Sequence, residues 1–317
     1  MHSHSHHFIM YKNIQGGSMQ EITVEENLKT RIDSFLSEQL EESRSKIAKM
    51  LKQEYILVNN KPVRASYLPL KGDIITIQEF NEQMDVEPEN IALDIVYEDD
   101  DVMIINKPNG MVVHPAAGNS SGTLVNGLMY HSKNLSTING EFRPGIVHRI
   151  DAYTTGLLMI AKNDKAHQFL AEQLQNKTTT RKYIALVWGV IKNDTGTIDA
   201  PIGRDTNDRK KMAVTATNSK EAITHFKVLE RYKNATLIEL QLETGRTHQI
   251  RVHMSYIGYP IVNDPVYGKR KLIDDSGQCL HAKTIGFVHP TTKQYMEFSS
   301  ELPECFIKIM NQLKEEK

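Results

Sequence analysis

The sequence lacks several features that mark particular classes of protein. It has only two cysteines, Cys279 and Cys305, without metal-site spacing, so no disulfide or zinc framework is expected and a reducing, cytoplasmic setting is favoured. No apolar run approaches the ~20 residues that a membrane-spanning helix needs, so no membrane partner is predicted. The formal net charge is −1, so any nucleic-acid binding has to come from local basic patches.

Two further absences narrow the chemistry. No glycine-rich segment has the spacing of a phosphate-binding loop, and no histidine, cysteine and acidic cluster has metal-site spacing, so neither a nucleotide cofactor nor a metal is expected. The 317 residues, 39% hydrophobic and 24% charged, have the composition of an ordinary globular protein. This length allows one large domain or two unequal ones, and a monomer is the expected state.

The first 18 residues combine alternating histidines with a Gly-Gly-Ser segment. A metal site is conceivable there, but this pattern is typical of a purification tag and linker. Residues 1–18 are therefore left out of the fold prediction, and Met19 is the expected natural start.

Residues 19–82 are predicted to form a small module. Apolar residues at helical spacing predict helices over residues 32–40 and 47–51, with Ser43 as the N-cap of the second. A strand is expected over residues 55–58, followed by a turn at Asn59-Asn60, and another over residues 74–77, preceded by a turn at Gly72. The second helix carries the candidate RNA-binding residues Arg44, Lys46 and Lys49. The alternative is an ordinary solvated helix face. Residues 83–92 are acidic, polar and interrupted by Pro88, which is typical of a linker.

The central loop of the remaining 93–317 domain concentrates polar side chains. Two short apolar runs, Ile146-Val147 and residues 157–161, are predicted to be buried strands. Between them lie His148, Arg149 and Asp151. A carboxylate held between core strands with an arginine nearby is suited to catalysis, because a lone buried charge is costly. A surface turn with a solvated Asp–Arg pair is the alternative.

The rest of this domain alternates strands with helices. Strands are predicted over residues 93–97, 102–105, 178–189, 222–229 and 235–242, and helices over residues 165–174 and 306–313. The acidic segment 98–101 lacks the spacing and glycine of a calcium loop, so a solvated turn is expected.

Two polar segments complete the candidate site. Residues 205–215 include Arg209, Lys210 and Lys211 and are predicted to be a mobile basic loop that engages the RNA backbone, with a loop of no role as the alternative. In residues 243–254, Thr247 can cap a helix. His248 and His253 are five residues apart, the wrong step for a helical zinc pair.

Four ordered segments carry a resemblance to a known family. His148-Arg149-Ile150-Asp151, followed by Thr154-Thr155-Gly156-Leu157-Leu158, resembles the H-R-L-D-x-x-T-S-G-L signature of the RluA/RluD family of RNA pseudouridine synthases. Ile150 and Thr155 are mild departures. The other segments, beginning at Asn106, Lys182 and Thr244, resemble the N-K-P-x-G-x-x-x-H-P, K-x-Y-x-A-x-V and T-G-R-T-H-Q-I-R-V-H motifs of this family. Residues 31–73 are similar to the S4-type RNA-binding module, with Asn60 where glycine is usual.

The resemblance implies an α+β fold, in which a mixed, largely antiparallel sheet core with flanking helices follows a small α/β RNA-binding module. It implies conversion of uridine to pseudouridine in structured RNA, with large-subunit (23S) ribosomal RNA as the expected target and tRNA as the alternative. Asp151 would be the catalytic residue, Arg251 its partner with Arg246 as the alternative, and Tyr183 would stack on the base. Arg149 would fill the space of the flipped nucleotide, beside His148.

Three alternatives remain open at this stage. A non-catalytic RNA-binding or ribosome-assembly factor would keep the fold without the reaction. A hydrolase that uses His148 or His248 would cleave RNA rather than isomerise it. Within the expected reaction, Asp151 either attacks the sugar covalently or first removes a sugar proton, and the sequence does not distinguish the two.

Overall fold

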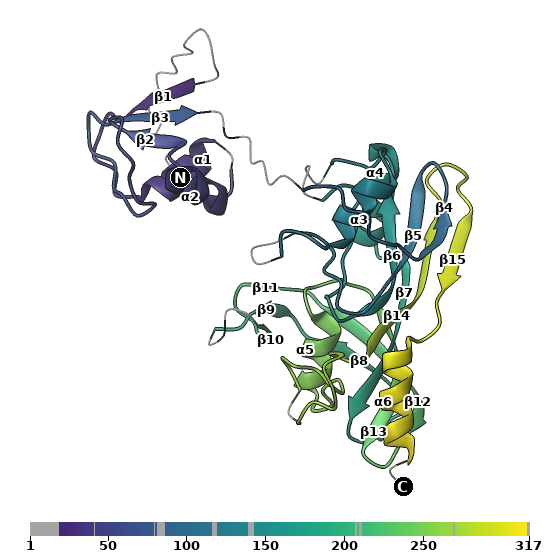
Figure 1. The fold of residues 1–317 in the computed structure, drawn as a ribbon. Coiled ribbons are helices and arrows are strands. Elements are labelled where there is room, and N and C mark those ends of the chain that lie inside the picture. The colour runs from purple at the N-terminus through teal and green to yellow at the C-terminus, as the bar shows by residue number, and fades with distance from the viewer. Residues whose placement is uncertain are drawn as a thin grey trace. The chain divides into compact units, whose positions relative to one another are not determined.

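The computed structural model describes residues 19–40, 42–78, 80, 86–115, 119–138, 143–206, 208, 211–268 and 270–315. The chain forms two compact units, divided between residues 84 and 85 (Figure 1). The predicted α+β class is confirmed. No helix in the described part of the chain combines the length and apolar character of a membrane-spanning segment.

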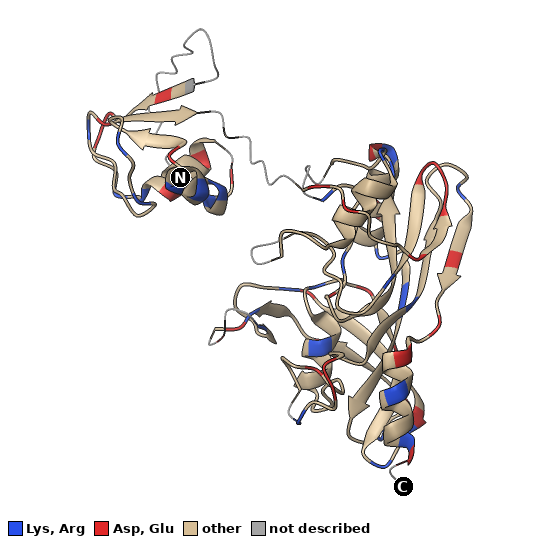
Figure 2. Cartoon of the chain, viewed as in Figure 1, with Lys and Arg blue, Asp and Glu red and all other residues tan. Residues whose placement is uncertain are grey.

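The small unit is a three-stranded antiparallel sheet packed against two helices (Figure 1). Its strands are β1 (Met19–Thr23), β2 (Ile56–Val58) and β3 (Ile74–Gln78), in the order β1-β3-β2, and its helices are α1 (Ile32–Gln39) and α2 (Arg44–Lys52). Ser43 caps α2 as predicted, because its hydroxyl accepts the Lys46 N–H at 3.2 Å. The polar side of α2 carries several basic residues (Figure 2).

The large unit is built on one nine-stranded sheet. Its strand order is β4-β5-β6-β14-β7-β13-β12-β8, with β15 added alongside β14, and every pair is antiparallel except β6–β14. The strands are β4 (Ile95–Glu98), β5 (Val102–Lys107), β6 (Thr155–Ala161), β7 (Thr180–Trp188), β8 (Thr195–Asp199), β12 (Ile223–Arg231), β13 (Ala235–Leu242), β14 (Leu280–Val288) and β15 (Tyr295–Ser299). A small second sheet has the order β10-β9-β11, from Met212–Val214, Ile202–Arg204 and Ser219–Lys220.

Strand β6 explains how the core is layered, because all seven of its residues are buried. Successive side chains of a strand point to opposite faces of the sheet. Leu158 and Ile160 therefore join the cluster that includes helix α3 (Leu124–His131), whereas Leu157 and Met159 join the cluster of helix α4 (Asp164–Gln175). Helices α5 (Gln249–Tyr256) and α6 (Glu304–Glu315) complete the unit.

The segment predicted as a linker begins to pack onto the large unit at Val86, which is buried in its core. The Asn126 side chain of α3 donates to the Glu87 carbonyl at 2.8 Å, and the Glu89 N–H donates to the Asn126 carbonyl at 3.0 Å. Residues 83–85 lie outside the described residues.

Three local predictions were wrong. Ile146-Val147 is not a strand: Ile146 makes a single bridge to Ile160, because the chain turns at Gly145 with φ of 72°. Part of the expected basic loop forms β10 instead. Thr247 does not cap α5, because His248 occupies the N-cap position with φ of 57° and no side-chain cap bond.

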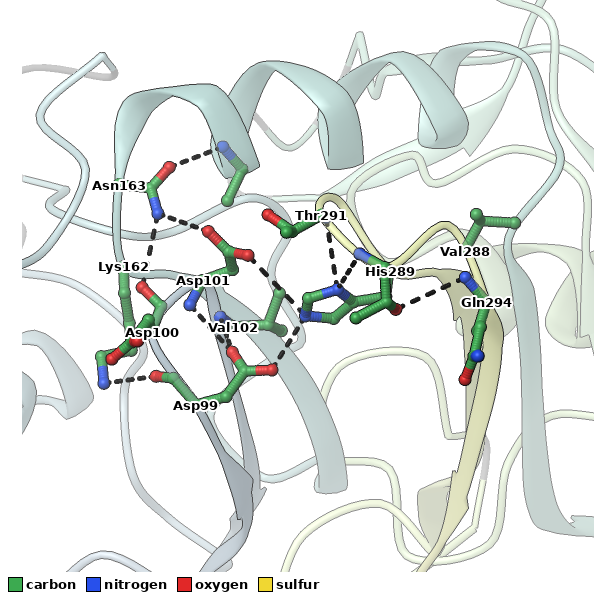
Figure 3. Close-up of polar contacts among 12 residues, drawn as sticks. Asp99, Asp100, Asp101, Val102, Lys162, Asn163, Val288, His289, Thr291 and Gln294 are labelled. Carbon is green, nitrogen blue, oxygen red and sulfur yellow. Dashed lines mark hydrogen bonds and ion pairs between the residues drawn. The ribbon is translucent and has the colours of Figure 1, made fainter.

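The acidic turn between β4 and β5 is bonded rather than simply solvated (Figure 3). The Asp99 carboxylate accepts the backbone N–H groups of Asp101 and Val102, both at 2.8 Å, and the Tyr97 hydroxyl at 2.6 Å. The buried His289 ring pairs with Asp99 at 2.8 Å from just beyond β14. These contacts tie the edge hairpin to the centre of the sheet.

Candidate active site

A buried lysine braces the loop that carries Asp151. Lys107 at the end of β5 is 1% exposed, and its ammonium donates to the carbonyls of Pro108, Met111 and Ala152 at 2.7–2.9 Å. Burial lowers the pKa of Lys107 to about 7, while the negative charge of Asp151 opposes this shift. Because a neutral amine has only two N–H groups, only the charged form can donate a hydrogen bond to each of the three carbonyls. The brace therefore fixes the backbone beside Asp151.

Asp151 is paired with Arg251 of α5. The Arg251 Nη1 donates to Asp151 Oδ2 at 2.8 Å, while Nε and Nη2 grip the Asp264 carboxylate at 2.8 and 2.9 Å. Asp264 also accepts two backbone N–H groups, from Val266 and Tyr267. Burial lowers the pKa of Arg251, but the two carboxylates outweigh burial and raise it. Arg251 is thus a cation held in a fixed position, with its Nη1 group bound to Asp151.

His248 faces the other oxygen of Asp151, with Nε2 at 3.8 Å from Oδ1. Its Nδ1 lies 2.8 Å from the Tyr267 hydroxyl, which accepts the Met212 N–H at 2.9 Å. The tyrosine proton is therefore free to go to Nδ1, which leaves the ring proton on Nε2, toward Asp151. Burial lowers the pKa of His248, so the ring is neutral at pH 7.

Asp151, His248 and Arg251 line a cleft with a volume of about 450 Å³. Tyr183 of β7 is buried in the wall of the cleft. Arg149 is exposed and also lines the cleft, and its Nη1 lies 3.2 Å from Nε2 of His114. The residues that line the cleft are Val147, His148, Arg149, Ile150, Asp151, Thr154, Leu174, Gln175, Arg181, Tyr183, Leu242, Gly245, Arg246, Thr247, His248, Gln249, Ile250, Arg251 and Leu280. A nucleotide-sized ligand fits a cleft of this size.

The structure distinguishes the two arginines that the sequence left as candidates. Arg246 lines the same cleft, but its Nε donates to the Glu221 carbonyl at 2.8 Å, and the ion pair with Asp151 is made by Arg251. His148 also lines the cleft, with Nε2 accepting the Met159 N–H at 3.0 Å. Burial, together with the charge of Arg181, lowers the pKa of His148 to about 3, so its ring is neutral.

The other basic candidates that the structure describes have partners within their own units. Arg44 binds Asp33 at 3.2 Å, Lys46 pairs with Glu42, and Lys49 lies 5.9 Å from the ring centre of Phe80. In the large unit, Lys211 pairs with Asp208 at 3.8 Å. Arg209 and Lys210 lie outside the described residues.

Four residues of this site were not foreseen from the sequence: Arg181, His248 as a partner of Asp151, Asp264 and Tyr267. Asp264 and Tyr267 lie in the polar turn after Ile261-Val262, and a carboxylate two residues after a buried apolar pair was the available signal. Within the described ranges, no three histidine, cysteine or acidic side chains gather as they would to hold a metal ion.

Comparisons with known proteins show which families the chain resembles. The family profile for RNA pseudouridylate synthases matches residues 101–256, and the S4 domain profile matches residues 30–75. A Bacillus subtilis (strain 168) protein named "Uncharacterized RNA pseudouridine synthase YlyB" is 55% identical over 297 residues, which cover 93% of this chain and 98% of that protein. The "Ribosomal large subunit pseudouridine synthase D" of Neisseria meningitidis serogroup B is 42% identical over 298 residues, covering 90% of this chain and 79% of that protein.

A solved structure also resembles this chain. The structure titled "Human RNA Pseudouridylate Synthase Domain Containing 1" matches with a TM-score of 0.55 and 25% sequence identity. The match covers 74% of this chain and 98% of that one.

Proposed function

The chain belongs to the RluA/RluD family of RNA pseudouridine synthases and carries an S4 domain, and we propose that it acts on large-subunit (23S) ribosomal RNA through Asp151. The ion pair between Asp151 and the doubly held Arg251 carries this proposal. It presents one charged carboxylate to a cleft of nucleotide size. Relatives named for ribosomal large-subunit RNA support the target, and an rRNA substrate implies activity in the cytoplasm.

The reaction needs a nucleotide outside its RNA stack. Flipping a base costs a few kcal/mol, and a site that acts on a base must repay this cost with its own contacts. Arg149, exposed beside the cleft, can fill the vacated place because its planar guanidinium both stacks and binds phosphate. The buried ring of Tyr183 supplies a stacking surface for the base.

Asp151 serves the sugar end of the nucleotide. Positive character develops at the anomeric carbon as the glycosidic bond breaks, and a fixed carboxylate stabilises that charge or accepts a bond from it. Since Arg251 occupies Oδ2, the free oxygen is Oδ1, on the side of His248. Both the covalent route and removal of a sugar proton use this oxygen.

Tritium release from RNA labelled at uridine C5 tests the catalytic role. Asp151→Asn is expected to bind RNA like the wild type and to retain less than about 1% of its rate, because the amide lacks the charge. Asp194→Asn is the matched control, since Asp194 is 83% exposed in a surface pair with Arg231. A wild-type protein that binds RNA without releasing tritium would instead be a binding or assembly factor.

Mapping pseudouridines in a strain that lacks the gene tests the target. The proposal predicts one or more lost sites in 23S rRNA that return when the wild-type gene is restored. Losses confined to tRNA would overturn the ribosomal assignment but not the enzymatic one.

A further inference from the structure

A second arginine lies buried in the cleft without an acidic partner. Arg181 precedes Tyr183 by two residues on β7, so both side chains point to the same face of the sheet. Arg181 is 7% exposed, and its Nη2 makes one hydrogen bond, to the Glu243 carbonyl at 3.2 Å. Its Nε is buried with no acceptor among the described residues.

The described residues supply no carboxylate to balance the charge of this guanidinium. Arg251 in the same cleft is neutralised by two carboxylates, whereas no carboxylate of the described residues pairs with Arg181. Burial lowers the pKa of Arg181, but an arginine remains charged at neutral pH. An unpaired buried cation is costly to folding. Such a group is kept where a ligand brings the missing negative charge.

The position of Arg181 favours the base over a phosphate as this ligand. Arg149 and Arg246 line the cleft with more exposed side chains, suited to the RNA backbone, while Arg181 lies deeper beside Tyr183. A Cβ on residue 245 would lie 2.8 Å from Arg181 Nη1, so Gly245 leaves this guanidinium room. The base is the part of a flipped nucleotide that enters a pocket.

We propose that Arg181 binds a carbonyl oxygen of the flipped uracil and stabilises the negative charge that the base acquires during the reaction. This inference rests on the proposed function. When the bond between C1′ and N1 breaks, its electron pair leaves with the base, and the charge spreads over N1, O2 and O4. The base then turns, C5 bonds to C1′ and loses its proton, and N1 is protonated, so that the product is an isomer of the substrate. A cation already fixed in a buried site stabilises this anion without rearrangement.

The substitution Arg181→Met tests this role, because methionine keeps an unbranched apolar stem without the charge. Single-turnover tritium release is expected to fall by about 10²–10³-fold, the usual effect of removing one group that stabilises a developing anion. The slope of log Kd for RNA against log salt should stay unchanged, because no phosphate contact is lost. The thermal unfolding midpoint should stay or rise, because the variant removes an unpaired buried charge. Arg181→Lys should recover part of the rate.

A matched arginine should show the opposite pattern. Arg231 has its Nε on the Ile191 carbonyl at 2.7 Å and its Nη2 on Asp194 at 2.6 Å, outside the cleft. Arg231→Met is expected to lower the unfolding midpoint and leave tritium release unchanged.

Three results would overturn the proposal. A weaker Kd with a flatter salt dependence in Arg181→Met would show that Arg181 holds a phosphate. A lower unfolding midpoint with activity lost in proportion would show a structural arginine, and an unchanged rate would show no role. If the wild type itself releases no tritium, it is the proposed function that fails.

Discussion

Arg44 of the small unit and Arg251 of the large unit both reach aspartates, but in different surroundings. The Arg44 side chain is 57% exposed and shares Asp33 with Arg31, which is also half-exposed. The Arg251 side chain is 5% exposed and holds two carboxylates at once. Exposed pairs contribute about 0–1 kcal/mol and weaken with salt. Removing one partner of a buried pair costs about 3–5 kcal/mol.

This difference separates two ways of using basic residues with RNA. Arg44, the single arginine of α2, keeps more than half of its side chain exposed, so it can exchange a carboxylate for a phosphate at little cost. Arg251 cannot leave Asp264 without stranding a buried charge. The small unit is therefore suited to adjustable affinity, and the cleft to one fixed arrangement of charges.

The largest effect is expected when the fixed arrangement is broken at Asp264. Asp264→Asn should lower the free energy of unfolding by about 3–5 kcal/mol, because Arg251 loses the fully buried one of its two carboxylate partners. The rate should fall at least about 10²-fold, since a misplaced Arg251 no longer orients Asp151. Chemical denaturation and single-turnover tritium release measure the two effects.

A double variant sharpens this test. Arg251→Met combined with Asp264→Leu replaces the buried pair with apolar groups, so part of the stability should return while activity stays lost. The recovery is incomplete, because the backbone N–H groups of Val266 and Tyr267 lose their acceptor. If Asp264→Asn alone matched the wild type in both measurements, the buried pair would not be what holds the site.

The large unit should lose stability at a higher pH than the small unit. No histidine occurs between residues 19 and 84. In the large unit, chiefly through burial, the pKa values of His114 and His281 are lowered to about 4 and that of His148 to about 3. Below pH 6.5 the unfolded chain gains protons that the folded histidines do not take. Stability of the large unit therefore falls as the pH drops from about 6.5 toward 4, by about 1.4 kcal/mol per pH unit for each histidine.

The small unit should lose stability only at a lower pH. Burial raises the pKa values of Asp33 and Asp73, but hydrogen bonds, with the Arg31 and Arg44 charges at Asp33, lower them below the ordinary 3.8. Their stabilisation is present above pH 3.8 and is lost as the pH falls further.

Fluorescence of the single tryptophan, Trp188 in β7, reports the large unit, and hydrogen exchange of β3 reports the small one. His148→Gln keeps an acceptor for the Met159 N–H without the titration, and should flatten the acid dependence. Simultaneous unfolding of both units near pH 5 would contradict the prediction that the large unit is the more sensitive to acid.

Sequence patterns predicted what local rules determine. Helical spacing gave α1, α2, α4 and α6, and the Asn59-Asn60 turn has the positive φ values expected of asparagine. Motif resemblance brought Asp151 and Arg251 together although they lie a hundred residues apart. Neither kind of signal gave the role of Asp264 or Arg181, because these roles depend on which charges tertiary packing leaves paired or unpaired.

The missed elements have the same cause. Strand β1 has a sequence of MQEIT, with little apolar content, and it forms because β3 offers an unpaired edge. Helix α3 contains Asn126 and Gly127, both poor helix formers. It is stabilised by the capping box of Thr123 with Asn126, and Gly127 packs closely against Leu93 and Ile91. These stabilising contacts are tertiary or specific to the cap.

The smallest effect is expected at Arg44, the exposed partner of the buried Asp33 in the small unit. Arg44→Met should raise the Kd for RNA by less than about tenfold at moderate salt. It should reduce the slope of log Kd against log salt by about 0.7–0.9, the contribution of one phosphate contact. The stability change should stay below about 1 kcal/mol, because Arg31 still pairs with Asp33 at 2.9 Å. Lys314→Met is the matched control, since Lys314 on α6 of the large unit forms an exposed pair with Glu230 of β12. Equal salt slopes for both variants would remove α2 from the RNA interface.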